Sequence, residues 1–165
     1  MVIREAIGKD AEQIIAVIRN AEESNFMLFG PGERKLETEQ FTKFIENFHN
    51  NSHSALFVAE IEKQIVGYLI VQGNHMPSRV SHRAYIVVGI HQEYRGQKIG
   101  TALFSHLDDW AKEKSIHRLE LTVMTNNTAG IALYKKMGFE IEGTKKHSLY
   151  VDGEYRDEYY MAKIV

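Results

Sequence analysis

One junction between a strand pattern and a helix pattern constrains this chain more than any other feature. Residues 84–90, Ala-Tyr-Ile-Val-Val-Gly-Ile, are rich in β-branched and aromatic side chains, which favour a half-buried strand. Apolar residues then recur at every fourth position, which predicts a helix with one side facing a core. These residues are Ile99, Leu103, Leu107 and Ala111. The chain must therefore turn across residues 95–98. The first amides of a helix are unpaired and carry partial positive charge, so this turn is predicted to hold an anion such as phosphate.

The spacing of the glycines distinguishes between the known kinds of phosphate loop. A Walker loop ends in Gly-Lys-Ser/Thr, whereas here Gly100 is followed directly by Thr101. The dinucleotide fingerprint needs three glycines in a βαβ unit, and that pattern is not met either. The segment instead resembles the pyrophosphate-binding loop of the GNAT superfamily of N-acetyltransferases, which reads Gln/Arg-x-x-Gly-x-Gly/Ala after a strand. Arg95, Gly96 and Gly100 take the positions of that motif.

Lys98 stands where this family has its central glycine. We expect the lysine to be tolerated, because it still presents a backbone N–H at the helix start and adds a cation near phosphate. A bulky residue in place of Gly100 is expected to project where the backbone meets phosphate. The alternative is that Gly96 and Gly100 only permit a tight turn and close helix packing. By resemblance, the residues of the strand and loop that hold coenzyme A are Val88, Gly89, Ile90, Arg95, Gly96, Gln97, Lys98, Ile99, Gly100 and Thr101.

A second stretch, residues 126–139, resembles the other signature of the family, Asn-x-x-Ala-x-x-Leu-Tyr-x-Lys-x-Gly-Phe. Gly130 stands where alanine is usual. The stretch predicts a helix from about Asn127, a good N-cap, to Gly138, a good stop. The resemblance implies that Asn127 hydrogen-bonds coenzyme A and that Tyr134 sits near the thioester sulfur. The alternatives are that Asn127 only caps the helix and that Tyr134 is an ordinary core aromatic.

The rest of the chain fits a single α/β (α+β) domain over residues 1–165. The predicted element order is βααβββαβαββ, with helices over residues 10–23, 38–49, 99–111 and 127–138. Strands are predicted over residues 2–6, 55–61, 65–72, 84–90, 118–123, 139–150 and 155–163, and Asp152-Gly153 is predicted to be a hairpin turn. The resemblance implies a mixed, mostly antiparallel central sheet flanked by helices, with splayed central strands between which coenzyme A wedges. Gly89 inside its strand suits a bulge, or else makes room for packing.

Charge and cysteine content narrow the class of protein. The 20 Lys and Arg nearly balance the 22 Asp and Glu, so no nucleic acid or membrane partner is predicted from overall charge. The chain has no cysteine, which excludes disulfides and a thiolate nucleophile. With no apolar leader in the first residues, we expect a cytoplasmic enzyme. His49 and His53 lack a third ligand, and no serine lies in a Gly-x-Ser-x-Gly elbow, so we expect neither a metal nor serine hydrolase chemistry.

The resemblance implies transfer of an acetyl group from acetyl-CoA to a primary amine by direct attack. A backbone N–H near residues 88–90 would polarise the thioester carbonyl, and Tyr134 would donate a proton to the departing thiolate. The acceptor is a small-molecule amine or a protein amino group, and its identity is not readable. Glu22, Glu23, Glu37 and Glu39 would either attract a cationic amine or form a solvated helix surface.

Several alternatives stay open at the level of sequence. The general base is not assigned, and the candidates are Glu23, His75, His82 and Tyr85. A non-catalytic acyl-CoA-binding module on the same fold is the runner-up, and the third hypothesis is a nucleic-acid-binding domain that uses Lys145 and Lys146 with the tyrosine-rich tail. That tail would otherwise serve sheet packing, an acceptor pocket or a homodimer face. Its members are Tyr150, Tyr155, Tyr159 and Tyr160.

Overall fold

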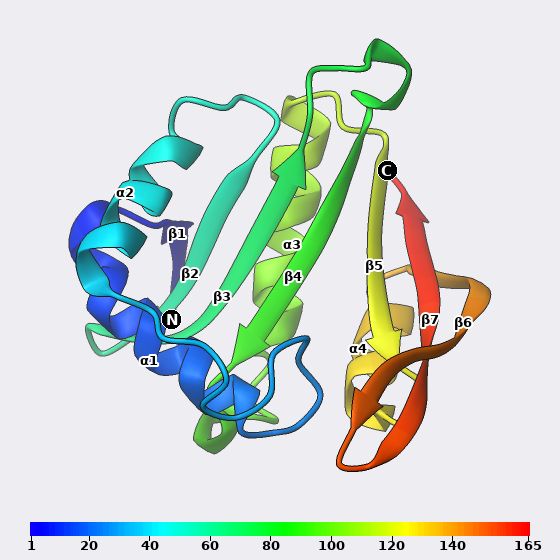
Figure 1. Ribbon diagram of the computed structural model, residues 1–165. Coiled ribbons are helices and arrows are strands. Elements are labelled where there is room, and N and C mark those ends of the chain that lie inside the picture. The colour runs from blue at the N-terminus through cyan, green and yellow to red at the C-terminus, as the bar shows by residue number, and fades with distance from the viewer.

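A seven-stranded sheet forms the centre of the protein, and the computed structural model describes all residues from 1 to 165 (Figure 1). The strand order is β1-β2-β3-β4-β5-β7-β6, and only β4 and β5 run parallel. The strands are β1 (Val2–Glu5), β2 (Ala55–Ile61), β3 (Gln64–Gly73), β4 (Arg83–Ile90), β5 (Arg118–Met124), β6 (Glu140–Val151) and β7 (Glu154–Ile164). The helices are α1 (Ala11–Glu22), α2 (Thr38–Phe48), α3 (Ile99–Glu113) and α4 (Thr128–Lys136). The predicted element order is confirmed, with small shifts at the boundaries.

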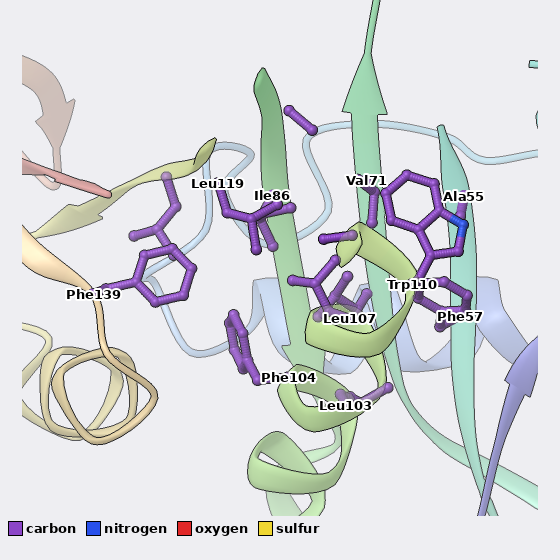
Figure 2. Close-up of a cluster of buried hydrophobic side chains, with 14 of the residues drawn as sticks. Ala55, Phe57, Val71, Ile86, Leu103, Phe104, Leu107, Trp110, Leu119 and Phe139 are labelled. Atoms are coloured by element: carbon purple, nitrogen blue, oxygen red, sulfur yellow. The ribbon is translucent and has the colours of Figure 1, made fainter. Parts of the chain in front are cut away.

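Helices cover both faces of the sheet, because its central strands are apolar on both sides. In β2, Phe57 and Ala59 belong to the buried cluster beneath α3, whereas Leu56 and Val58 belong to the cluster beneath α1 and α2. Figure 2 shows the first cluster, in which Phe104, Leu107 and Trp110 of α3 pack against β2, β3 and β4. This alternation between faces is the period of two expected for a buried strand. None of the helices combines the length and the hydrophobicity that a bilayer-spanning helix requires.

The two central strands diverge after a short stretch of pairing. β4 and β5 pair only where residues 83–85 face residues 118–120, and beyond that point neither strand has the other as a neighbour. Each stays paired on its outer side, β4 with β3 and β5 with β7. The opening is visible between the green and yellow strands in Figure 1. The predicted splaying of the central strands is therefore confirmed.

Gly89 does not form a bulge. It lies directly opposite Tyr68 in an unbroken register between β3 and β4, and the irregularity in this part of the sheet falls between Ala59 and Glu60 of β2. A Cβ atom on Gly89 would lie 2.5 Å from Cε1 of the buried Tyr68 ring. The glycine therefore makes room for that ring, so the packing alternative is right and the bulge interpretation is wrong.

The last two strands form a long hairpin. Asp152 and Gly153 at its turn have φ angles of 49° and 79°, which is the left-handed pair of a two-residue type I′ turn. The predicted Asp-Gly turn is confirmed.

The tail tyrosines do not share one environment. Tyr150 and Tyr155 are exposed near the turn, Tyr159 packs partly against the core, and Tyr160 lines the cavity described below.

Candidate active site

The opening between β4 and β5 leads into a cavity of about 1300 Å³. Its walls come from β4, β5, β6 and β7, the start of α3, the helix α4, and the segment after α1. Gln97 is the one predicted cofactor-binding residue that does not line it. The others do, and they are Val88, Gly89, Ile90, Arg95, Gly96, Lys98, Ile99, Gly100, Thr101, Asn127 and Tyr134. The fold thus brings both sequence signatures to one space.

The turn before α3 presents a row of free backbone amides. The first backbone hydrogen bond of the helix runs from Ala102 N–H to Lys98 O at 3.1 Å, and the amides of residues 96–101 donate to no backbone or side-chain acceptor. Residues 95–98 are exposed, so the turn is not blocked. Unpaired amides at a helix start, with the cations of Arg95 and Lys98 beside them, suit a phosphate group.

Lys98 has a left-handed backbone conformation, with φ 62° and ψ 19°, and forms the N-cap of α3 without a side-chain cap. A β-carbon is disfavoured in that conformation and glycine is not. This explains why the motif has glycine here. The lysine is accommodated at a conformational cost, and its backbone N–H, like those of its neighbours, has no acceptor in the protein.

Replacing Lys98 with glycine is expected to stabilise the protein by about 0.5–1 kcal/mol, because the loss of left-handed strain exceeds the entropy that glycine adds to the unfolded chain. Urea denaturation measures this. The control is Lys98→Met, which keeps the strain and removes the charge. Both variants should lose the same severalfold affinity for coenzyme A in calorimetry. Unchanged affinity in Lys98→Met would show that the ammonium group does not contribute to binding.

The edge of β4 that faces the opening offers alternate backbone groups. His91 N–H donates to Val66 O on the β3 side at 2.8 Å. Since successive peptide groups in a strand point to opposite sides, the N–H groups of Val88 and Ile90 point towards the opening, where β5 no longer pairs. Gly89 directs its backbone to β3. Among the predicted residues 88–90, the two outer ones can pair with an extended ligand.

Gly100 serves the packing of α3 against α4. A Cβ atom there would lie 2.6 Å from Cδ2 of Leu133 and 3.3 Å from Cδ1 of Ile90. The expectation that a side chain at this position would project towards phosphate is therefore wrong. The conflict lies inside the protein, between two helices whose first turns both line the cavity.

Asn127 caps α4, since its Oδ1 accepts a hydrogen bond of 3.0 Å from Gly130 N–H. A Cβ atom on Gly130 would lie 2.7 Å from Nδ2 of Asn127, so the glycine lets the asparagine side chain fold over the helix start. Asn127 is therefore a helix cap, and whether it also contacts coenzyme A is a separate question. The predicted contact of Asn127 with coenzyme A stays a prediction, and the Nδ2 donor is the group left to make it.

Asn127→Ala is expected to lower the free energy of unfolding by about 1 kcal/mol, and Asn127→Ser to change it little, because serine caps as well as asparagine does. Thermal and urea unfolding measure both. Neither variant keeps the side-chain amide. If Asn127 contacts coenzyme A through that amide, both variants should therefore lose the same affinity for coenzyme A. A loss in the alanine variant alone would assign the residue to capping and nothing more.

Tyr134 lies on α4 with its ring held between two phenylalanines. The ring centroids of Phe104 and Phe139 are 5.7 and 6.3 Å away, both in edge-to-face geometry. The side chain is partly exposed, and it lines the cavity. Burial, with a smaller contribution from the nearby Tyr85, raises the pKa of Tyr134 to about 12. The phenol is therefore protonated at neutral pH and available as a proton donor.

Of the four candidate bases, only Tyr85 lines the cavity; its hydroxyl is hydrogen-bonded to Thr122 Oγ1 at 2.7 Å. Glu23, His75 and His82 lie outside it. Among the acidic residues considered for attracting an amine, Glu22 is 3% exposed and paired with Arg34 at 3.0 Å. It is therefore not part of a solvated surface, and it does not line the cavity either.

The charged residues on the far side of the opening were not predicted from the sequence as site residues. Arg118 of β5 is paired with Glu120 at 3.0 Å and with Glu142 of β6, and Arg118 holds the pKa of the Glu142 carboxyl below its usual range. Glu158 accepts a hydrogen bond of 2.6 Å from Ser148. Glu120, Glu142 and Glu158 all line the cavity. The alternation of β5 was a usable signal, because it sets Arg118, Glu120 and Thr122 on the face opposite the buried Leu119.

Comparison with known proteins agrees with the geometry. The sequence profile of the Acetyltransferase (GNAT) family matches residues 16–139. The chain therefore belongs to the GNAT family and is an acetyl-CoA-dependent N-acetyltransferase.

Individual relatives support this assignment. The L-amino acid N-acetyltransferase AaaT of Escherichia coli is 37% identical over 65% of this chain and 66% of its own length. The N-alpha-acetyltransferase of Sulfurisphaera tokodaii is 30% identical over 97% of this chain and 90% of its own. A GNAT acetyltransferase from Streptococcus pneumoniae superposes with a TM-score of 0.93 at 28% identity, over 99% of this chain and 98% of its own.

Proposed function

We propose that this protein transfers the acetyl group of acetyl-CoA to a primary amine by direct attack, with Tyr134 as the acid. One observation carries the proposal. The residues with free amides at positions 96 and 98–101, the unpaired edge of β4 and the Tyr134 ring all line one cavity. A ligand with a diphosphate at one end, an extended arm and a reacting sulfur at the other has a complementary partner at each of these places.

Each group of the chain has a task in the reaction. The amides at residues 96–101, with Arg95 and Lys98, hold the diphosphate. Ile90 pairs through its N–H with the extended arm, and the N–H of Val88 polarises the thioester carbonyl. When the amine attacks, a C–N bond forms and the C–S bond breaks. One proton leaves the amine for water, Tyr134 supplies one to the departing sulfur, and water then returns a proton to Tyr134.

The distribution of charge in the cavity supports an amine acceptor. Arg95 and Lys98 lie at the phosphate-binding turn. Three carboxylates, those of Glu120, Glu142 and Glu158, lie across the opening on β5, β6 and β7, with Arg118 and Lys145. An anionic cosubstrate is therefore drawn to the turn, and a basic acceptor to the strands on the other side. Relatives whose names specify L-amino acids and alpha-amino groups are consistent with an amine.

The test is release of free thiol from acetyl-CoA by the purified protein in the presence of L-amino acids, spermidine or an alanine-initiated peptide. Turnover of at least one acceptor is expected, together with binding of coenzyme A in calorimetry. Binding without turnover of any amine would favour the non-catalytic module. Absence of binding would overturn the proposal.

A further inference from the structure

A pair of hydroxyl groups bridges the two diverging strands at the point where they separate. Tyr85 is the last residue of β4 that pairs with β5, and its partner in register is Glu120. Beyond that pair, Tyr85 Oη lies 2.7 Å from Oγ1 of Thr122, the next residue of β5 on the same face. The side chain of Tyr85 is 37% exposed, and both residues line the cavity.

This pair lies on the face of the sheet that α1 covers. Val87, two residues after Tyr85 in β4, packs against the cluster beneath α1 and α2, which fixes the direction of that face. Tyr160 of β7 is the direct neighbour of Thr122 and also lines the cavity. Three hydroxyl-bearing side chains thus cross β4, β5 and β7 in a row.

The segment between α1 and α2 lines another part of the same cavity, towards the β6–β7 turn. Phe26, Met27 and Leu28 line the cavity, and Asn25 ties the segment to the β6–β7 turn through a hydrogen bond of 2.7 Å to Asp152. Figure 1 shows the segment, in blue, reaching across the lower end of the opening between β4 and β5. The hydroxyl pair lies at the opposite end of the opening, where β4 and β5 still pair.

The distance along β4 places the pair at the reacting end of the cavity. From Ile90, beside the phosphate-binding turn, back to Tyr85 the strand runs five residues, which is about 17 Å at the usual rise. An arm that follows the open edge of β4 away from the turn ends near the point where the strands meet.

The carboxylate nearest to the Tyr85–Thr122 pair is already paired with arginines. The two hydroxyls are therefore the hydrogen-bond acceptors that stay free at this point. Glu120 is already paired with Arg118 at 3.0 Å and approached by Arg83 at 3.7 Å. Two hydroxyls that share one hydrogen bond keep unused lone pairs and one free O–H. They can accept an N–H without placing a charge next to it.

We propose that the Tyr85–Thr122 hydroxyl pair receives the amino group of the acceptor and turns its lone pair towards the thioester carbon. This inference rests on the proposed acetyltransferase function and names the acceptor side of the same site. Tyr85 then binds the nucleophile as a neutral hydrogen-bond acceptor. It is not the base.

The experiment compares Tyr85→Phe and Thr122→Val with wild type, using whichever of L-amino acids, spermidine and the alanine-initiated peptide the wild type acetylates. Each variant should raise KM for that acceptor about tenfold and keep the affinity for coenzyme A within about twofold. The double variant should raise KM by less than the product of the two single effects, because the hydroxyls act as a pair. Thr122→Ser, which keeps the hydroxyl, should restore the wild-type KM.

Tyr155→Phe is the matched control, because Tyr155 is 62% exposed near the hairpin turn and does not line the cavity. This variant should leave both KM for the acceptor and the affinity for coenzyme A unchanged. Wild-type KM values in both Tyr85→Phe and Thr122→Val would overturn the inference and leave the acetyltransferase function standing. A wild-type protein that binds coenzyme A and acetylates none of the three probes would overturn both. Circular dichroism melts confirm that the variants compared are folded.

Discussion

Tyr134→Phe is expected to lower the turnover number about a hundredfold and to change the affinity for coenzyme A by less than about twofold, as removal of a general acid does. The phenyl ring fits between Phe104 and Phe139 as the phenol does, so the packing of α4 is retained. Only the hydroxyl is lost. Steady-state kinetics give kcat, and calorimetry gives the affinity for coenzyme A.

The pKa of Tyr134 adds a second readout. A pKa near 12 means that the acid keeps its proton throughout the usual assay range, so the loss in Tyr134→Phe should be the same at pH 7 and pH 9. Tyr150→Phe serves as a control, because Tyr150 is 67% exposed and lies outside the cavity. Equal turnover numbers in Tyr134→Phe and wild type would refute the acid role.

Gly100→Val is expected to lower the free energy of unfolding by about 2–3 kcal/mol, as overpacking of a close contact does. The added side chain meets Leu133 and Ile90, so α3 and α4 must separate. Because the first turns of both helices line the cavity, affinity for coenzyme A should fall at least about tenfold as well. Urea denaturation and calorimetry measure the two effects.

A second substitution tests the cause. Leu133→Ala removes the atoms that a valine at position 100 would meet, so the double variant should be more stable than the sum of the two single effects predicts. Gly100→Ala should fall between wild type and Gly100→Val. Strict additivity of Gly100→Val and Leu133→Ala would show that the helix contact is not the reason for the glycine.

Much of the fold could be predicted from local sequence. The period of two in residues 118–123, the period of nearly four after Ile99, and the Asp152-Gly153 turn each specify an element through interactions between near neighbours. The two sequence signatures, at residues 95–100 and 126–139, also indicated the family. The homodimer, the cytoplasmic location and the individual contacts with coenzyme A stay predictions.

Local sequence could not predict which charged side chains meet in the cavity. Glu142 and Arg118 are far apart in the chain. Their side chains meet across β7, because the strand order of the sheet places β6 next but one to β5. Glu22 looked like one of several helix carboxylates, and its burial depends on Arg34 from the segment that follows. Gly89 and Gly100 were recognised as special, but their reasons are the rings and methyl groups of Tyr68 and Leu133.

The sequence alone determined the order of the elements, the free amides before α3 and the family, because periodicity, turn residues and helix ends act over a few neighbouring positions. The tertiary structure decided how β4 and β5 separate, which of four candidate bases reaches the cavity, and that Tyr85 bonds Thr122. Those features depend on strand pairing and packing between distant segments, and their energies appear only when the whole sheet is assembled.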